Sequence, residues 1–293
     1  MVITTTDFAH GATNKVEFVE EQAGGKGINV ALQLKNLNLV PTCLGFNFSV
    51  GGEKLDHKLN TAEIPHSFEY VPGRLRTNTK LYEPSTNIMT ELNQSGDFVP
   101  QVYVNQLIRH VKTAGAKGGL LVLSGSIPPG VPDDIYKTLA EIWSGPVILD
   151  ATGKPLRLAA EGAPLYAIKP NMHELSATFN TTLSTPEEII NFCRKNLKHI
   201  PLVCVSMGEK GAVLVTKTAA YSAPARKVDV KSLHGAGDAM LAGLIHGLVT
   251  DKPPPELLRR GLAAASAKVQ SNSWCSFAEF KAMLGKIPAP YIM

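Results

Sequence analysis

Short apolar runs alternate with amphipathic stretches along the chain from about Val102 onward. The runs are apolar throughout, which is typical of parallel strands that are covered on both faces. These predicted strands are 119–124, 146–150, 165–168 and 202–206. The stretches between them predict helices at 132–143, 155–161 and 186–198, the last capped by Ser184 or Thr185. The repetition of strand and helix predicts an α/β fold with an open, mostly parallel sheet and helices on both faces.

The part of the chain before residue 100 has a different pattern. Apolar and polar residues alternate at 16–20 and in parts of 68–71, 77–82 and 88–92, with turn-forming residues between them. Alternation of this kind predicts half-exposed antiparallel strands. One helix is expected among them, from about Asn29 to Leu37. We therefore expect a small β-sheet attached to a larger α/β body.

Composition narrows the functional classes. The chain has 293 residues, of which 44% are hydrophobic and 18% charged, and a formal net charge of +4. These values are typical of a globular protein with a large core. Because the basic residues form no run or stripe, no nucleic-acid partner is expected. The four cysteines lack zinc-site spacing, and neither a signal peptide nor an apolar window of about 18 residues is present. We expect a cytoplasmic protein with reduced thiols and no membrane partner.

A first glycine-rich segment, Gly24-Gly25-Lys26-Gly27, directly precedes the first predicted helix. Glycines allow the backbone to approach a ligand, and the free N–H groups of a helix start favour anions. A sugar or a phosphate fits such a segment, although an ordinary glycine turn explains it about as well. It is no Walker A loop, because Gly27 follows Lys26. It also lacks the third glycine of a dinucleotide fingerprint, which argues against a dinucleotide oxidoreductase.

A second segment, Gly235-Ala236-Gly237-Asp238, opens a helix that is rich in small residues. Small residues expose successive N–H donors beside one carboxylate, which suits a reaction in which negative charge develops while a hydroxyl loses its proton. An Asp with its ordinary pKa of about 3.9 is ionised at neutral pH, so Asp238 needs no shift to act as a base. The alternative is that Asp238 simply caps the helix.

A third segment, 169–175, follows a predicted strand and enters a helix. Asn171 and Glu174 are three residues apart and share a helix face, so that they can organise Mg²⁺ through its waters. The alternative is a capping pair, with Asn171 as the N-cap. We expect His173, between them, to face solvent.

Taken together and in this order, these segments resemble the PfkB (ribokinase-like) carbohydrate kinases, in particular the branch of bacterial 1-phosphofructokinases and tagatose-6-phosphate kinases. The segments 24–31 (G-G-K-G-I-N-V-A) and 235–238 (G-A-G-D) are similar to the two signatures of that branch. The resemblance covers nearly the whole chain, because it continues through 76–78, 90–93, 123–130, 169–171 with Glu174, and 205–208.

The resemblance implies ATP-dependent, Mg²⁺-assisted phosphoryl transfer to a sugar hydroxyl by a single kinase domain over 1–293. It implies a three-layer α/β/α body and a small antiparallel β lid, with lid strands within about 11–24 and 68–94, which often forms a homodimer interface. It assigns the roles residue by residue. Asp238 is the base, and Gly235, Ala236 and Gly237 form the anion hole. The sugar phosphate is bound by Gly24, Gly25, Lys26, Asn29 and Arg76. The nucleotide site contains Lys169, Asn171, Glu174, Ser206 and Gly208, of which Asn171 and Glu174 hold Mg²⁺ through water.

The expected acceptor is fructose 1-phosphate, giving fructose 1,6-bisphosphate, because R-T-N at 76–78 and T-E-L-N at 90–93 resemble that branch more than the tagatose-6-phosphate kinases. The sequence departs from the family pattern in several places, and the first of these leaves an alternative function open. Family members usually begin with a strand ending in N-P-x-x-D, which this sequence lacks, so an N-terminally shortened, catalytically impaired sugar-phosphate-binding protein is the other hypothesis. It predicts that the remaining strands close up and that the sugar site contains no carboxylate except Asp238. In addition, Leu233-His234 and Ala239 stand where Thr-Val and Ser are usual, which is expected to weaken nucleotide or helix-start contacts.

Overall fold

The main body is built on a seven-stranded sheet. The computed structural model describes residues 1–6, 8–86 and 88–293. Its largest sheet has the order β13-β12-β11-β10-β9-β8-β7, in which β7 to β10 are parallel and β11 to β13 are antiparallel additions at one edge. The strands are β7 (Leu121–Ser124), β8 (Val147–Asp150), β9 (Ala167–Ile168), β10 (Leu202–Ser206), β11 (Ala212–Thr216), β12 (Ala220–Ala223) and β13 (Tyr291–Ile292). All four predicted strands of the body are confirmed, although β9 is only two residues long.

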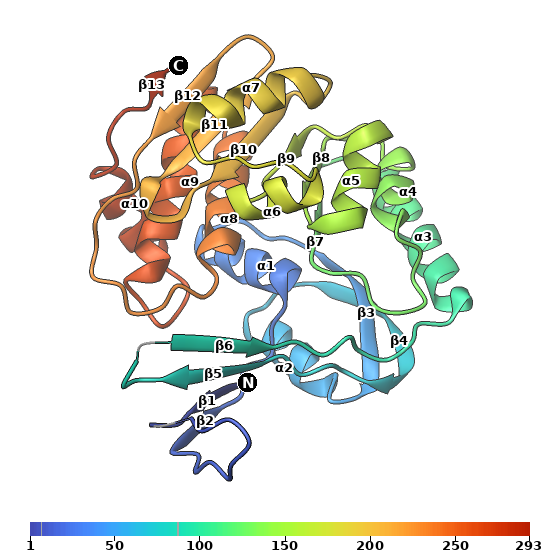
Figure 1. The fold of residues 1–293 in the computed structure, drawn as a ribbon. Coiled ribbons are helices and arrows are strands. Elements are labelled where there is room, and N and C mark those ends of the chain that lie inside the picture. Colours follow the sequence, from blue (N-terminus) through green and yellow to red (C-terminus); the bar gives the residue numbers. More distant parts are fainter. Residues whose placement is uncertain (7, 87) are drawn as a thin grey trace.

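Helices cover both faces of this sheet (Figure 1). One face packs against α3 (Gln101–Gly115), α4 (Ile135–Glu141), α5 (Gly153–Gly162), α6 (Met172–Thr178) and α7 (Pro186–Asn196). The other face packs against α1 (Lys26–Asn36), α8 (Ala236–Val249), α9 (Pro254–Val269) and α10 (Phe277–Leu284). Successive strand residues alternate between the two cores, so that Leu149 lies in the first cluster and Ile148 in the second. The predicted α/β class with two helical layers is therefore confirmed.

A separate two-stranded sheet extends the body. In it, β3 (Cys43–Val50) pairs in parallel with β4 (His66–Arg74), and α2 (Glu53–Thr61) connects them. This corrects the expectation of an antiparallel strand at 68–71. Val71, fully buried, shares the core cluster of the first body face with Phe48. Parallel pairing follows from the intervening helix, because two parallel neighbours need a crossover connection.

The shortened-protein hypothesis expects the remaining strands to close up, and the placement of β3 and β7 tests this. Among the described residues β3 and β7 belong to different sheets and do not pair, although α1 packs against both. The closing up of strands that this hypothesis expected is therefore not observed.

The lid is a four-stranded sheet of order β2-β1-β5-β6 beside the body (Figure 1). It consists of β1 (Val2–Thr4), β2 (Phe18–Glu20), β5 (Thr79–Glu83) and β6 (Ile88–Leu92). The expected strands near 16–20, 77–82 and 88–92 are present, but β1 precedes the expected lid ranges and pairs in parallel with β5. The lid is therefore mixed rather than antiparallel. Three residues are too few for an alternating pattern, which is why the sequence did not reveal β1.

The sequence predicted the start of α7 correctly but not that of α1. Thr185 is the N-cap of α7 in a reciprocal capping box with Glu188, as one of the two predicted caps. In contrast, α1 begins at Lys26 rather than near Asn29, because the glycine turn itself forms the helix start. Among the described helices, none combines the length and hydropathy that a transmembrane segment requires.

Candidate active site

The N-terminus of α1 is formed by the first glycine segment. Gly25 is the N-cap at φ 145°, a backbone conformation that favours glycine, and its carbonyl accepts from the Asn29 amide at 2.8 Å. A Cβ added to Gly27 would lie 3.8 Å from the Ser124 carbonyl oxygen. The start of α1 therefore faces the carboxyl end of β7, and Gly24 and Gly25 remain exposed to a ligand.

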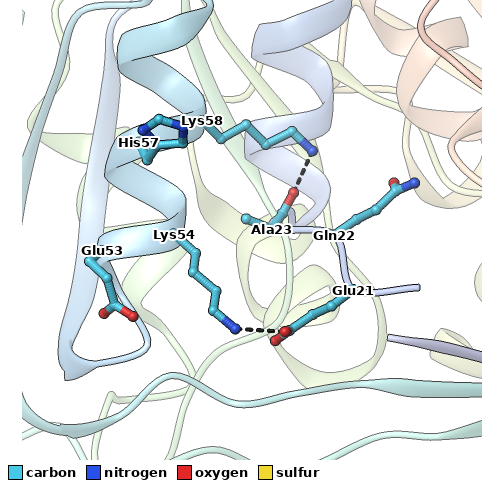
Figure 2. Close-up of a pocket in the computed structure, with 7 residues that line it drawn as sticks. All are labelled: Glu21, Gln22, Ala23, Glu53, Lys54, His57 and Lys58. Carbon is cyan, nitrogen blue, oxygen red and sulfur yellow. Dashed lines mark hydrogen bonds and ion pairs between the residues drawn. The ribbon is translucent and has the colours of Figure 1, made fainter. Parts of the chain in front are cut away.

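Two lysines of α2 hold the chain that leads into this turn (Figure 2). Lys54 Nζ lies 2.6 Å from Glu21 Oε2, and Lys58 Nζ donates to the Ala23 carbonyl oxygen. An open pocket lies between this segment and α2, lined by Glu21, Gln22, Ala23, Glu53, Lys54, His57 and Lys58. None of the predicted site residues lines it. We interpret these contacts as a tether that positions Gly24 and Gly25.

The N-terminus of α8 is formed by the second glycine segment. Gly235 is its N-cap in the left-handed region, at φ +78°, and an added Cβ would lie 2.6 Å from the Trp274 ring. Ala236 N–H donates to the Leu233 carbonyl, so this amide is not a free donor as expected. The N–H groups of Gly237 and Asp238 have no hydrogen-bond partner among the described residues. These two amides are available to an anion.

Asp238 does not cap its own helix. It lies in the first turn of α8 with its side chain 7% exposed, and no side-chain cap is present there. Its Oδ2 instead accepts a hydrogen bond from Asn29 Nδ2 at 2.8 Å, which joins the starts of α8 and α1. The capping alternative is thus wrong.

The surroundings of Asp238 raise its pKa above the ordinary value of 3.8. Burial is the largest cause and the Asp150 carboxylate adds to it, while the Asn29 hydrogen bond, Lys169 and Lys26 act in the opposite direction. A raised pKa makes the carboxylate a stronger base.

A cluster of charges lies at the carboxyl edge of the sheet. Lys26 Nζ is 3.5 Å from Asp150 Oδ1 and 3.4 Å from Glu174 Oε1, and Lys169 Nζ is 3.3 Å from Asp150 Oδ2. Burial opposes the charge of Lys26, but Asp150, Glu174 and Asp238 outweigh it and raise the pKa of this lysine. Asp238 therefore shares this edge of the sheet with two further carboxylates, Asp150 and Glu174, which contact the two lysines.

Asp150 is the residue that the sequence reasoning missed. It ends β8 with a side chain that is 1% exposed. The available signal was a carboxylate at the carboxyl end of an apolar strand, where ligands bind in open α/β sheets. Lys26 and Asp150 are 124 positions apart, so only the fold brings them together.

The capping alternative for Asn171 and Glu174 is confirmed, because these residues form a reciprocal capping box at the start of α6. The Asn171 side chain accepts from Glu174 N, and Glu174 Oε2 accepts from Asn171 N, both at 2.8 Å. Glu174 Oε1 is left to face Lys26, and His173 is exposed as expected. The capping role fixes the orientation of the carboxylate without using up both of its oxygens.

The residues present fit a divalent cation. Asp150 Oδ2 is buried and has no hydrogen-bond partner among the described residues, because Lys169 approaches it without hydrogen-bonding geometry. The other oxygen of this carboxylate, Oδ1, and Glu174 Oε1 both lie within 3.5 Å of Lys26 Nζ. Asp150 and Glu174 thus supply carboxylate oxygens, the donors that Mg²⁺ prefers, at one place.

The remaining predicted residues lie around this centre. Ser206 ends β10 and forms a bridge with Asn171, and Gly208 adopts φ +61° with open space at its Cβ position. Arg76 lies apart from the charge cluster: its Nη2 donates to Ser126 Oγ, and no contact between Arg76 and Lys26 or Asp238 is found among the described residues. The structure thus brings together Lys26, Asn29, Glu174, Lys169 and Asp238. Arg76, Gly24 and Gly208 lie outside this group of charged residues.

Known proteins with similar sequences include sugar-phosphate kinases. The 1-phosphofructokinase of Bacillus subtilis is 32% identical over 275 residues, which cover 92% of this chain and 89% of that protein. The D-tagatose-1-phosphate kinase of Bacillus licheniformis is 32% identical over 271 residues, covering 91% and 88%.

Solved structures show the same fold. The phosphofructokinase-2 of Escherichia coli in complex with fructose-6-phosphate has a TM-score of 0.87 at 24% identity, covering 98% of this chain and 94% of that one. The family model described as pfkB family carbohydrate kinase matches residues 1–279. The chain therefore belongs to the pfkB family of carbohydrate kinases.

Proposed function

We propose that this protein transfers the γ-phosphoryl group of ATP to the C6 hydroxyl of a ketohexose 1-phosphate, with fructose 1-phosphate as the preferred acceptor and fructose 1,6-bisphosphate as the product. The observation that carries the proposal is the buried Asp238 carboxylate, held by Asn29 beside the free amides at the start of α8 and facing the Lys26 charge cluster. Proton acceptor, anion donors and charge-neutralising groups thus meet at one place, which is what phosphoryl transfer needs.

Asp238 acts as the general base. It accepts the proton of the sugar hydroxyl while the hydroxyl oxygen bonds to the γ-phosphorus and the bond to the β-phosphate oxygen breaks, leaving ADP. Burial keeps the carboxylate basic, and Asn29 holds it in one orientation through the 2.8 Å hydrogen bond. The amides of Gly237 and Asp238 donate to the charge that develops on the transferred group.

The nucleotide phosphates lie at the carboxyl edge of β8 to β10. Lys169 and Lys26 neutralise them, and Ser206 and Gly208 form the adjoining wall. A Mg²⁺ ion would supply Lewis-acid stabilisation of the phosphate charge here. Asp150 and Glu174 would hold it, with Asn171 fixing the orientation of Glu174 through the capping box.

The acceptor is held between the body and the lid. Gly24 and Gly25 leave the backbone open to the sugar phosphate, Lys26 supplies positive charge, and Arg76 lies at the base of the lid beside Ser126. Lid and body form one cytoplasmic kinase domain over 1–293. The lid limits access of water, which would otherwise hydrolyse ATP.

Two observations favour a 1-phosphate acceptor. Both named relatives, at 32% identity, act on a ketohexose 1-phosphate according to their names. The R-T-N and T-E-L-N segments point to the same branch. A second candidate is therefore tagatose 1-phosphate, and tagatose 6-phosphate ranks below it.

The test is a coupled ADP-release assay with fructose 1-phosphate, fructose 6-phosphate, tagatose 1-phosphate and tagatose 6-phosphate. We expect the highest kcat/KM with fructose 1-phosphate. Highest kcat/KM with a different acceptor would reassign the substrate, and no turnover with all four would contradict the kinase proposal. Calorimetry with the same sugar phosphates then distinguishes an impaired binding protein, which binds without turnover, from a chain that does neither.

We further propose that two copies associate through their lids. The lid strands expose apolar side chains to solvent: Phe18, Val19, Ile88, Met89 and Leu92. Exposed apolar side chains gathered on one small sheet are typical of an interaction surface. A second copy would offer the same surface in return, as a two-fold symmetric dimer requires.

A further inference from the structure

His234 stands directly before the anion-binding turn and is one of the departures noted in the sequence. Its Nδ1 lies 2.9 Å from Lys80 Nζ, although the two residues are 154 positions apart. Lys80 belongs to β5 of the lid, whereas His234 belongs to the loop that opens α8. The contact therefore crosses from the lid to the body.

Lys80 is itself held in place within the lid. It stands directly opposite Glu91 in the β5–β6 ladder, and its Nζ lies 2.9 Å from Glu91 Oε1. Lys80 N also donates to the Met1 carbonyl oxygen, which ties β5 to the start of β1. The ammonium group is thus presented to His234 by both neighbouring strands.

The body side of the contact is equally fixed. Gly235 packs so closely on Trp274 that no side chain fits there, and the amides of Lys231 and Ser232 donate to the Val269 carbonyl at the end of α9. His234 therefore sits on a turn whose position is set by α8 and α9. The lid strands pack mainly on one another, so a side-chain contact such as that between Lys80 and His234 is what connects them to the body.

We propose that His234 is a positioning residue, which ties the lid to the start of α8 by accepting a hydrogen bond from Lys80, and that protonation of its imidazole releases the lid. An ammonium group can donate only to an unprotonated Nδ1, so the neutral ring carries its proton on Nε2. A protonated ring would place two cations at this distance, and the contact becomes repulsive.

The charged groups around His234 set the direction of the pH effect. The pKa of His234 is lowered by partial burial of its ring and by three nearby cations: Lys80, Lys268 of α9 and the N-terminal amine. Glu91 of β6 raises it. The net pKa lies below the ordinary value of 6.5. The contact is therefore complete above about pH 6.5, the pKa of an unperturbed His, and is lost as the pH falls toward the lowered value.

The test measures the distance between lid and body without any substrate, so its result does not depend on the proposed kinase activity. Thr90→Cys on β6 accepts a fluorophore selectively, because the four native cysteines are buried. Trp143→Phe leaves Trp274 as the sole donor for energy transfer. We expect efficient transfer at pH 7.5 and a shift of about fivefold in the open-to-closed ratio at pH 5.5, because repulsion between two exposed cations is small.

Three variants in this background decide the outcome. His234→Asn keeps an acceptor near the Nδ1 position but does not titrate, so transfer should stay high at both pH values. Lys80→Met removes the donor, so transfer should be low at both. His57→Asn, at an exposed histidine of α2, is the matched control and should behave as the unmodified protein. A pH response that persists in His234→Asn, or undiminished transfer in Lys80→Met at pH 7.5, would overturn the proposal.

Kinetics provide a second readout that rests on the proposed function. His234→Phe should raise KM for the sugar phosphate severalfold and leave kcat nearly unchanged, and His234→Asn should restore KM. A merely structural role would lower the melting temperature of both variants and leave no rescue.

Discussion

At the scale of single residues, the proposed base Asp238 offers the most direct test of catalysis. Its carboxylate is buried and accepts a hydrogen bond from Asn29. Asp238→Asn removes the proton acceptor and keeps the shape, so kcat should fall by about 10²- to 10⁴-fold, the usual contribution of a general base. Nucleotide affinity, measured by calorimetry, should change little.

Asp251→Asn is the matched control, because Asp251 is exposed just beyond the other end of α8. It should keep full activity. If Asp238→Asn retained the activity of this control, the role of Asp238 as base would be wrong.

The same carboxylate links stability to pH. The pKa of Asp238 in the folded protein lies above the ordinary value of 3.8, so between the two values the folded state binds more protons than the unfolded state. Stability therefore falls as the pH rises through the folded-state pKa. Asp238→Asn should be more stable than the unmodified protein at pH 8, and the difference should disappear near pH 4. Urea unfolding at three pH values measures this, and an equal difference at all of them would contradict the assignment.

At the scale of elements, the start of α8 depends on Gly235. This residue combines φ +78° with a Cβ position only 2.6 Å from the Trp274 ring. Gly235→Ala should destabilise the protein by about 2–3 kcal/mol, because overpacking adds to backbone strain. Gly153→Ala, at φ +63° with open space around its Cβ, isolates the backbone effect and should cost about 1 kcal/mol. Equal losses in urea unfolding would show that the Trp274 contact is unimportant.

In the described part of the chain, three helices begin with the same reciprocal capping box, at Asn171, Thr185 and Ser276. Replacement of each N-cap by Ala should cost about 1 kcal/mol of unfolding free energy. Only Asn171→Ala should also raise KM for ATP, since Asn171 orients Glu174 in the charge cluster. A similar KM change in all three variants would mean that the effect is one of general stability.

At the scale of the whole molecule, the lid surface predicts association. Phe18 on β2 is 57% exposed, and a carboxylate there should oppose burial against a second copy. Phe18→Glu should shift sedimentation from dimer to monomer without changing the circular dichroism spectrum. Val40→Glu places the same charge at an exposed apolar site off the lid and should leave the dimer intact. A dimer that persists in Phe18→Glu would move the interface elsewhere.

Much of the body could be predicted because its signals are local. The runs at 147–150 and 202–206 are apolar in sequence and buried in the structure, and the Asn171 and Thr185 caps lie within one turn of their partners. The pairing of β4 could not be predicted. An alternating pattern reports which face of a strand is buried, but not the direction of its neighbour.

The sequence alone therefore determined the α/β class and the two glycine-rich helix starts, while its assignment of base and anion donors stays a prediction. Each depends on periodicity, capping or backbone freedom within a few residues. The tertiary structure decided that Asp238 binds Asn29 instead of capping α8, that Asp150 joins Lys26, and that Lys80 of the lid reaches His234. These contacts join residues more than a hundred positions apart, so they follow from how the crossovers and the lid bring the strand ends and helix starts together.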